Sequence, residues 1–278
     1  GINMALQIDD FTGNVLAAFF PKTDYNSILS AAHTFDEPTS AADPYDSYTI
    51  VVGREQKTHI YPGMVASRLS LSANVGEYVM LSADFVGCRE SATHAAVTAV
   101  TFDGEAVDAL YFSNGNVFFD DGTDTAPAAS ASIKSVSFEI NLNRDTDNAY
   151  ALGDSTYRRA PPAQRREISG TIEFNQVLYG DQALDEPDYT SLVTADGVQY
   201  NDGTDPVMKL TFQEEASGAS NYIDIMFYNI RWEAPSSNVS GRDTQTMSVG
   251  FIGLLDTNTA DKAMRIQMKG GAAGTSVY

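Results

Sequence analysis

Apolar and polar residues alternate with a period of two along most of this chain, between turns rich in Gly, Asn and Asp. Successive side chains of a β-strand point to opposite faces of the sheet, so the alternation predicts strands with one dry and one wet face. Residues 68–73 place Leu69, Leu71 and Ala73 on the dry face, and residues 77–85 form a matching strand after the turn at 74–76. The pattern therefore predicts a mainly β fold that contains this hairpin.

Residues 133–142 and 167–175 show the most regular alternation. Their dry positions are Val136, Phe138, Ile140, Leu142, Ile168, Ile172 and Phe174. Their wet positions are Ser135, Ser137, Glu139, Asn141, Glu167, Ser169, Thr171 and Glu173. A wet face so rich in Ser, Thr, Glu and Asn suits the wall of a water-filled channel.

The last third of the chain predicts four more strands, at residues 207–212, 221–232, 244–255 and 263–268. Residues 221–232 are bulky on both faces, which requires cover on both sides from a sandwich partner or another subunit. Residues 186–195 are the main helix candidate, because Tyr189, Leu192 and Val193 fall at helical spacing. The predicted fold is an antiparallel β-sandwich or barrel with one short flanking helix.

Three polar stretches lack any periodicity, at residues 31–48, 113–132 and 144–166. Loops of this length inside a compact domain usually bind something. The first stretch is acidic, and the third carries Arg158, Arg159, Arg165 and Arg166. Placed at opposite ends of a subunit, they would stack identical rings through charge pairing. The alternative is that the basic loop pairs within its own subunit.

The charge balance is strongly acidic, with 37 Asp and Glu against 17 Lys and Arg and a formal net charge of -20. Such a chain should not bind nucleic acid through its phosphates, although a surface that repels phosphates lets nucleic acid pass. The acidity fits a salt-rich environment as well as ordinary solubility. The apolar runs are too short to predict a membrane span.

Residue groupings that support catalysis are absent from the sequence. His33, His59 and His94 are scattered, without the spacing of a zinc site, and are interpreted as surface or turn histidines. The tetrapeptide DGTD at 121–124 and 202–205 is interpreted as a turn rather than a calcium loop. Cys88 is interpreted as a small buried hydrophobe. We therefore expect no catalytic residue, no metal and no cofactor.

Three segments resemble the tail tube (major tail) proteins of long-tailed viruses of bacteria and archaea. They are YPGMVASRLSLSANVGEYVMLSADFVG, SIKSVSFEINLNRDTDNAYALGDSTYRRAPPAQRREISGTIEFN, and IDIMFYNIRW followed by DTQTMSVGFIGLLD. The resemblance covers most of residues 48–270. It implies a structural virion protein with a β-sandwich or barrel core and a flanking helix, assembled as stacked rings, commonly hexamers. It also implies that inner strands of neighbouring subunits join into one β-barrel around a largely acidic DNA channel.

On this resemblance the chain is one tail-tube domain over residues 1–278, with an elaborated N-terminal region of about residues 1–130 and a core sandwich of about residues 131–270. Glu139, Glu167, Thr171 and Glu173 become candidates to face the lumen, and Arg158, Arg159, Arg165 and Arg166 become a candidate inter-subunit loop. The implied partners are further copies of the chain, other tail proteins at the tube ends, and DNA that passes without specific binding. A partial internal duplication would instead favour three subunits per ring. The competing class is a β-sandwich decoration protein or a sugar-binding adhesin.

Overall fold

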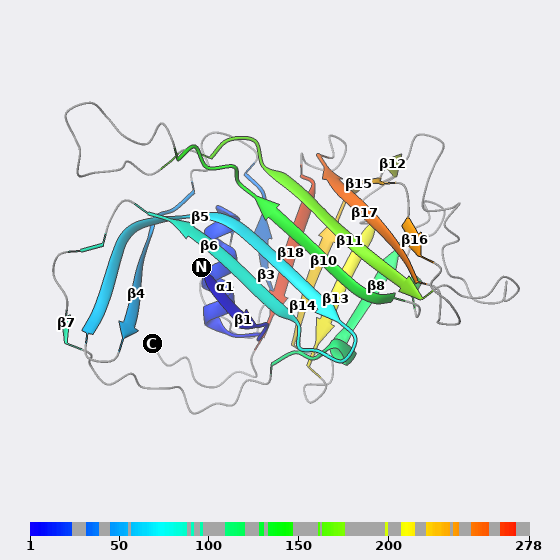
Figure 1. Cartoon of the computed structure of the whole chain (residues 1–278), viewed down its shortest axis with the longest axis horizontal. Helices are drawn as coiled ribbons and strands as arrows, with labels where there is room; N and C mark the ends of the chain where they lie inside the picture. Colours follow the sequence, from blue (N-terminus) through cyan, green and yellow to red (C-terminus); the bar gives the residue numbers. More distant parts are fainter. Residues whose placement is uncertain are drawn as a thin grey trace, which may run out of the picture.

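The computed structural model describes residues 1–23, 32–38, 45–54, 57–87, 90–91, 95–96, 109–119, 128–130, 133–146, 161, 163–175, 198–199, 207–214, 221–233, 236–238, 246–255 and 262–270. These residues form two packed antiparallel sheets and a short helix (Figure 1). The predicted fold class, a mainly β sandwich with a flanking helix, is confirmed. In the described part of the single chain the sheets remain open and do not close into a barrel.

Sheet A contains the two most regular segments of the sequence. Its strands, in order of pairing, are β1 (Ile2–Ala5), β6 (Met80–Val86), β5 (Lys57–Asn74), β10 (Ile133–Asn141), β11 (Glu167–Asn175), β17 (Thr246–Leu254), β15 (Asn229–Trp232) and β12 (Val198–Gln199). Three further strands attach to it, namely β16 (Ser236–Asn238) on β17, and β4 (Tyr48–Arg54) and β7 (Ala95–Ala96) on β5. The hairpin predicted at residues 68–85 is the β5–β6 pair, in which Leu71 lies opposite Leu81.

Sheet B lies behind sheet A in Figure 1, and its strands cross those of sheet A. Its order is β2 (Lys22–Thr23), β3 (His33–Asp36), β18 (Met264–Lys269), β14 (Tyr222–Phe227), β13 (Met208–Gln213), β8 (Gly115–Phe119) and β9 (Ala128–Ser130). Strands from the first and last thirds of the chain are neighbours here, since β3 pairs with β18.

The core fills the space between the two sheets. Phe227 packs edge-to-face on Phe138 of β10 and on Phe251 of β17, with ring centroids 5.5 Å and 5.4 Å apart. Trp232 also packs on Phe251, at 5.9 Å. Such aromatic pairs contribute about 0.5–1.5 kcal/mol each beyond the burial of their area, so this cluster fixes how sheet A sits on sheet B.

A single α-helix, α1 (Asp10–Phe19), is found in the described ranges and packs beside β5. Asp9 caps it, because its Oδ1 accepts a hydrogen bond from the Thr12 amide at 2.8 Å. Its buried side chains include Val15, Leu16 and Phe19. No helix in the described part of the chain is long and apolar enough to cross a membrane. The helix predicted at residues 186–195 lies outside the described residues.

The predicted strand at residues 221–232 is in fact two strands in different sheets. Ile223, Ile225 and Phe227 of β14 point into the core from sheet B, and Ile230 and Trp232 of β15 point into it from sheet A. The inward-facing positions change from odd to even at the corner between the strands. The apolar run thus supplies core residues to both sheets, while Asp224 of β14 and Asn229 of β15 are buried polar residues on the opposite faces of these strands.

Two stretches interpreted as loops contain strands. The acidic stretch at 31–48 holds β3, and the stretch at 113–132 holds β8 and β9. A short 3-10 turn, η1 (Phe112–Asn114), leads into β8. His33 is also corrected, since it is 9% exposed within β3 rather than a surface or turn residue. These strands are edge or near-edge strands of sheet B, where a strongly alternating apolar pattern is not required.

One pair of strands extends beyond the sandwich. β4 pairs with the first half of β5, from Tyr48 opposite Met64 to Arg54 opposite Lys57, while the second half of β5 lies in sheet A. We call residues 48–54 and 57–64 the β4–β5 arm, and Figure 1 shows these strands at the left of the molecule. Val51 in this arm is 57% exposed, although it is β-branched and apolar.

Candidate functional site

On β5, β10 and β11 the outer face of sheet A carries polar side chains, and on β17 the exposed Ile252 lies opposite Ser169 on the same face. Because the strands pair in register, the polar residues line up in rows across β5, β10 and β11, and one row continues to Ser248 of β17. The rows are Ser70–Glu139–Ser169, Ser72–Ser137–Thr171 and Asn74–Ser135–Glu173–Ser248. In Figure 1 this face is turned toward the viewer, and no described helix or strand lies over it. We call it the polar face.

All four residues predicted to face a lumen lie on the polar face. Glu167 and Thr171 are exposed, and Glu139 and Glu173 are partly exposed. The buried positions between them, such as Ile140 and Ile172, point into the core. The alternation therefore predicted which side chains of both strands point into the core and which point outward.

Two of the three glutamates predicted to face a lumen form ion pairs with neighbouring cations. Arg68 on β5 forms an ion pair with Glu139 on β10. Lys134 lies 3.1 Å from Glu173, and its hydrogen bond is the main reason that the pKa of Glu173 is held below its usual value. Glu167 forms no ion pair with any residue that the structure describes.

The two cations were not predicted as partners of the glutamates. Arg68 shares the wet face of its strand with Ser70 and Ser72, but its pairing with Glu139 depends on β5 lying beside β10, 71 residues further along the chain. The resulting face is more hydroxylic and less acidic than the composition alone indicates.

The basic loop emerges from a well-defined neck at the end of β10. Asn143 has a left-handed backbone (φ 44°) and donates from its side-chain nitrogen to the Arg165 carbonyl at 2.8 Å. Arg144 donates to the Ala66 carbonyl at 2.7 Å and lies over the Tyr45 ring. Burial lowers the pKa of Arg144, but its usual value is so high that it stays charged.

The four arginines predicted for the inter-subunit loop are in different situations. Arg158 and Arg159 lie outside the described residues. Arg165 is exposed. Arg166 lies 3.9 Å from Glu37 and over the Phe20 ring, 4.6 Å from its centroid. For Arg166, the structure shows pairing within its own chain, the alternative that the sequence left open.

That contact also brings together residues of the acidic and basic stretches, which were expected at opposite ends. Glu37 belongs to the acidic stretch and Arg166 to the basic stretch, and the two side chains lie 3.9 Å apart. Glu37 is 6% exposed, and its carboxylate accepts hydrogen bonds from the amides of Ala263 and Met264 at 3.3 Å and 3.1 Å.

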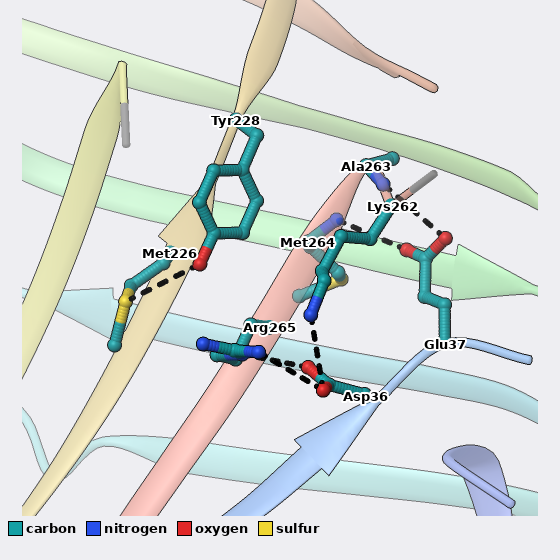
Figure 2. Close-up of polar contacts among 8 residues, drawn as sticks. All are labelled: Asp36, Glu37, Met226, Tyr228, Lys262, Ala263, Met264 and Arg265. Carbon is teal, nitrogen blue, oxygen red and sulfur yellow. Dashed lines mark hydrogen bonds and ion pairs between the residues drawn. The ribbon is translucent and has the colours of Figure 1, made fainter. Parts of the chain in front are cut away.

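Next to this contact, two cations from β18 and its approach hold Asp36, as Figure 2 shows. Arg265 donates to both Asp36 oxygens at 2.7 Å and 3.0 Å, and Lys262 donates at 3.0 Å. Burial raises the pKa of Asp36, but the hydrogen bonds from Arg265 and Lys262 outweigh burial and hold it below its usual value. We call Asp36, Glu37, Arg166, Lys262 and Arg265 the ionic junction.

The residues weighed as metal ligands in the sequence are only partly described by the structure. No group of three or more His, Cys, Asp or Glu side chains there lies close enough to hold a metal ion. His59 contacts Glu90 beside the arm. His94, Cys88 and both DGTD segments lie outside the described residues.

The fold and the polar face define a class: a β-sandwich protein with a broad hydrophilic sheet surface. A family model described as phage tail tube protein matches residues 1–253. The chain belongs to this family, which makes it a structural protein of the virion tail. No curated protein sequence matches it.

Proposed function

We propose that the chain polymerises into stacked rings that form the tail tube, with the polar face of sheet A as the wall of the DNA channel. The observation that carries the proposal is the registered field of hydroxyl and amide side chains on β5, β10 and β11. DNA slides best past a wall that offers neither cations for its phosphates nor large apolar patches. Pairing of Arg68 and Lys134 with glutamates supports this role, because both cations are already occupied.

The open sheet edges support ring closure. β1 and β12 end the pairing order of sheet A among the described residues, and exposed strand edges in a soluble protein are usually paired or protected. Joining the edge of one copy to the opposite edge of the next would extend sheet A around a ring. We expect hexameric rings that stack helically, with other tail proteins at the tube ends and no specific binding of the DNA.

Microscopy and chemical labelling test the proposal together. The starting protein carries Cys88→Ser, which removes the native thiol, and purified protein should form tubes in negative stain. Thr171→Cys then places a thiol on the polar face, and Asn116→Cys places one on the exposed outer face of sheet B as a matched control.

A maleimide attached to a polymer too large to enter the tube should label both variants as monomers. In tubes it should label only Asn116→Cys, while a small maleimide labels both. Protection of Asn116→Cys with free labelling of Thr171→Cys would show that the wall is inverted. Native mass spectrometry of isolated rings measures the subunit number, and a trimer would support the internal-duplication alternative.

A further inference from the structure

An exposed aromatic cluster lies at the end of sheet A where β5 turns into β6. Val75 and Tyr78 are 54% and 55% exposed. The Tyr78 and Tyr111 rings pack at 5.4 Å, and Tyr111 packs on Phe112 at 4.8 Å. We call these four residues the aromatic tip. Exposed, preorganised aromatic residues are typical of protein interfaces.

The tip is held in shape by the backbone. Tyr78 forms a bridge with Tyr111, and the Phe112 amide donates to the Glu77 carbonyl at 3.1 Å. Gly76 turns the chain at a positive φ of 87°. The side chains therefore remain exposed on a fixed backbone, which lowers the entropy cost of binding a partner.

At the opposite end of the same strand, its partner β4 carries another exposed apolar residue, Val51. β5 is 18 residues long and runs from the β4–β5 arm to the aromatic tip. Two-stranded hairpins are marginally stable alone, and exposed apolar strands invite pairing. Within this arm Val51 is paired with Ile60, yet it is more than half exposed. The neck of the basic loop lies at this end too, since Arg144 bonds Ala66 of β5.

The two ends have complementary charge as well as apolar character. Glu77 is exposed at the aromatic tip, where its carboxylate accepts a hydrogen bond from Asn74 at 2.9 Å. Arg165 is exposed at the other end. Neither side chain forms an ion pair with a residue that the structure describes.

We propose that the aromatic tip docks on the arm-and-neck end of a second copy of this chain, with Glu77 facing Arg165 of that copy. The proposal rests on the proposed function, because it assigns the contact between successive rings. A contact between two different surfaces repeats head to tail without limit, which is what a tube of indefinite length requires. Glu77 is the exposed carboxylate at the tip that this docking brings to Arg165, whereas Glu37 and Asp36 are bonded within their own chain.

The first test alters the apolar contact. Tyr78→Ser should leave rings intact in negative stain and shorten the tubes several-fold, whereas Tyr78→Leu, which keeps an apolar side chain, should retain longer tubes. Ile252→Ser is the matched control, because Ile252 is an exposed apolar residue (36%) of β17 away from the tip, and it lies opposite Ser169 on the polar face, where a serine matches its neighbours. The thermal unfolding of each monomer checks that folding is unchanged.

The second test reverses charges. Glu77→Arg and Arg165→Glu should each shorten the tubes, and the double variant should restore much of the wild-type length, because the pair is re-formed with opposite polarity. Single variants that shorten tubes without rescue would overturn the pairing of these two residues. Wild-type tube lengths in Tyr78→Ser and both single charge variants would overturn the docking proposal, while a wild-type protein without any rings would instead contradict the proposed function.

Discussion

The polar face and the ionic junction both contain pairs of a carboxylate with a cation, but the pairs serve different purposes in the two places. On the polar face, the side chains of Arg68 and Glu139 are 52% and 31% exposed, so water screens the interaction between their charges. In the ionic junction, Lys262 and Asp36 are 8% and 13% exposed. A carboxylate beside a cation thus moderates a surface potential in one place and joins distant parts of the chain in the other.

The difference matters because burial sets the energy of an ion pair. An exposed pair contributes about 0–1 kcal/mol, whereas removal of one partner of a buried pair costs about 3–5 kcal/mol, since the other charge is left without compensation. The junction should therefore determine the stability of the subunit, and the polar face should determine what the assembled surface presents to DNA.

The largest expected effect follows from breaking the junction. Asp36→Asn leaves Lys262 and Arg265 without their carboxylate, and we expect the free energy of unfolding to fall by about 3 kcal/mol. Urea denaturation of the monomer measures it. Asp84→Asn is the control, because Asp84 is 58% exposed at the side chain and should change stability by less than about 0.5 kcal/mol. Equal losses in the two variants would show that burial does not distinguish these sites.

A steric change beneath the polar face should have the next largest effect. A Cβ on Gly170 of β11 would meet the Phe251 ring and come within 2.5 Å of the Ser137 carbonyl oxygen. Gly170→Ala should therefore destabilise the fold by about 1–3 kcal/mol through overpacking. Gly53→Ala is a matched control, since nothing lies within 4 Å of its Cβ position. Retained stability in Gly170→Ala would mean that β11 shifts freely on the core, which contradicts its place at the centre of sheet A.

The contribution of Asp36 in the junction to the free energy of unfolding should depend on pH in the acid range. The pKa of Asp36 lies below its usual value of 3.8 in the folded chain. A lowered carboxyl pKa stabilises the folded state above the unfolded value, and this stabilisation disappears as pH falls through the folded value. The stability gap between wild type and Asp36→Asn should hold steady from neutral pH to about pH 4 and narrow below it. If the stability difference between wild type and Asp36→Asn narrowed between pH 7 and pH 5, the pH dependence would come from a group other than Asp36.

Local pattern was enough to predict the polar face. Each strand of the β10–β11 pair alternates over nine residues, and the period of two assigns every side chain to a face without knowledge of the partner strand. The orientations of Glu139, Glu167, Thr171 and Glu173 followed from that alone.

The junction could not be predicted in the same way, because it depends on long-range pairing. Asp36 and Lys262 lie 226 residues apart in the chain, and β3 is a four-residue strand inside a polar stretch. Helix α1 was also missed, although Asp9 is a suitable N-cap and Val15, Leu16 and Phe19 have helical spacing. The chain also passes from sheet B to sheet A at the corner between β14 and β15, and the continuous apolar run gave no sign of this change of sheet.

The smallest expected effect is that of the exposed pair on the polar face. A double-mutant cycle with Arg68→Gln and Glu139→Gln should give a coupling of about 0.5 kcal/mol that shrinks in added salt, because exposed charges are screened. Urea denaturation at low and high salt measures it, with Lys134→Gln and Glu173→Gln as a parallel cycle. A coupling above about 2 kcal/mol would mean that the pair is shielded from water, and the contrast with the junction would fail. If the coupling is small, the main role of Arg68 is to neutralise the charge of Glu139. Arg68→Gln should then make the surface potential of the assembled protein more negative and leave the stability of the subunit nearly unchanged.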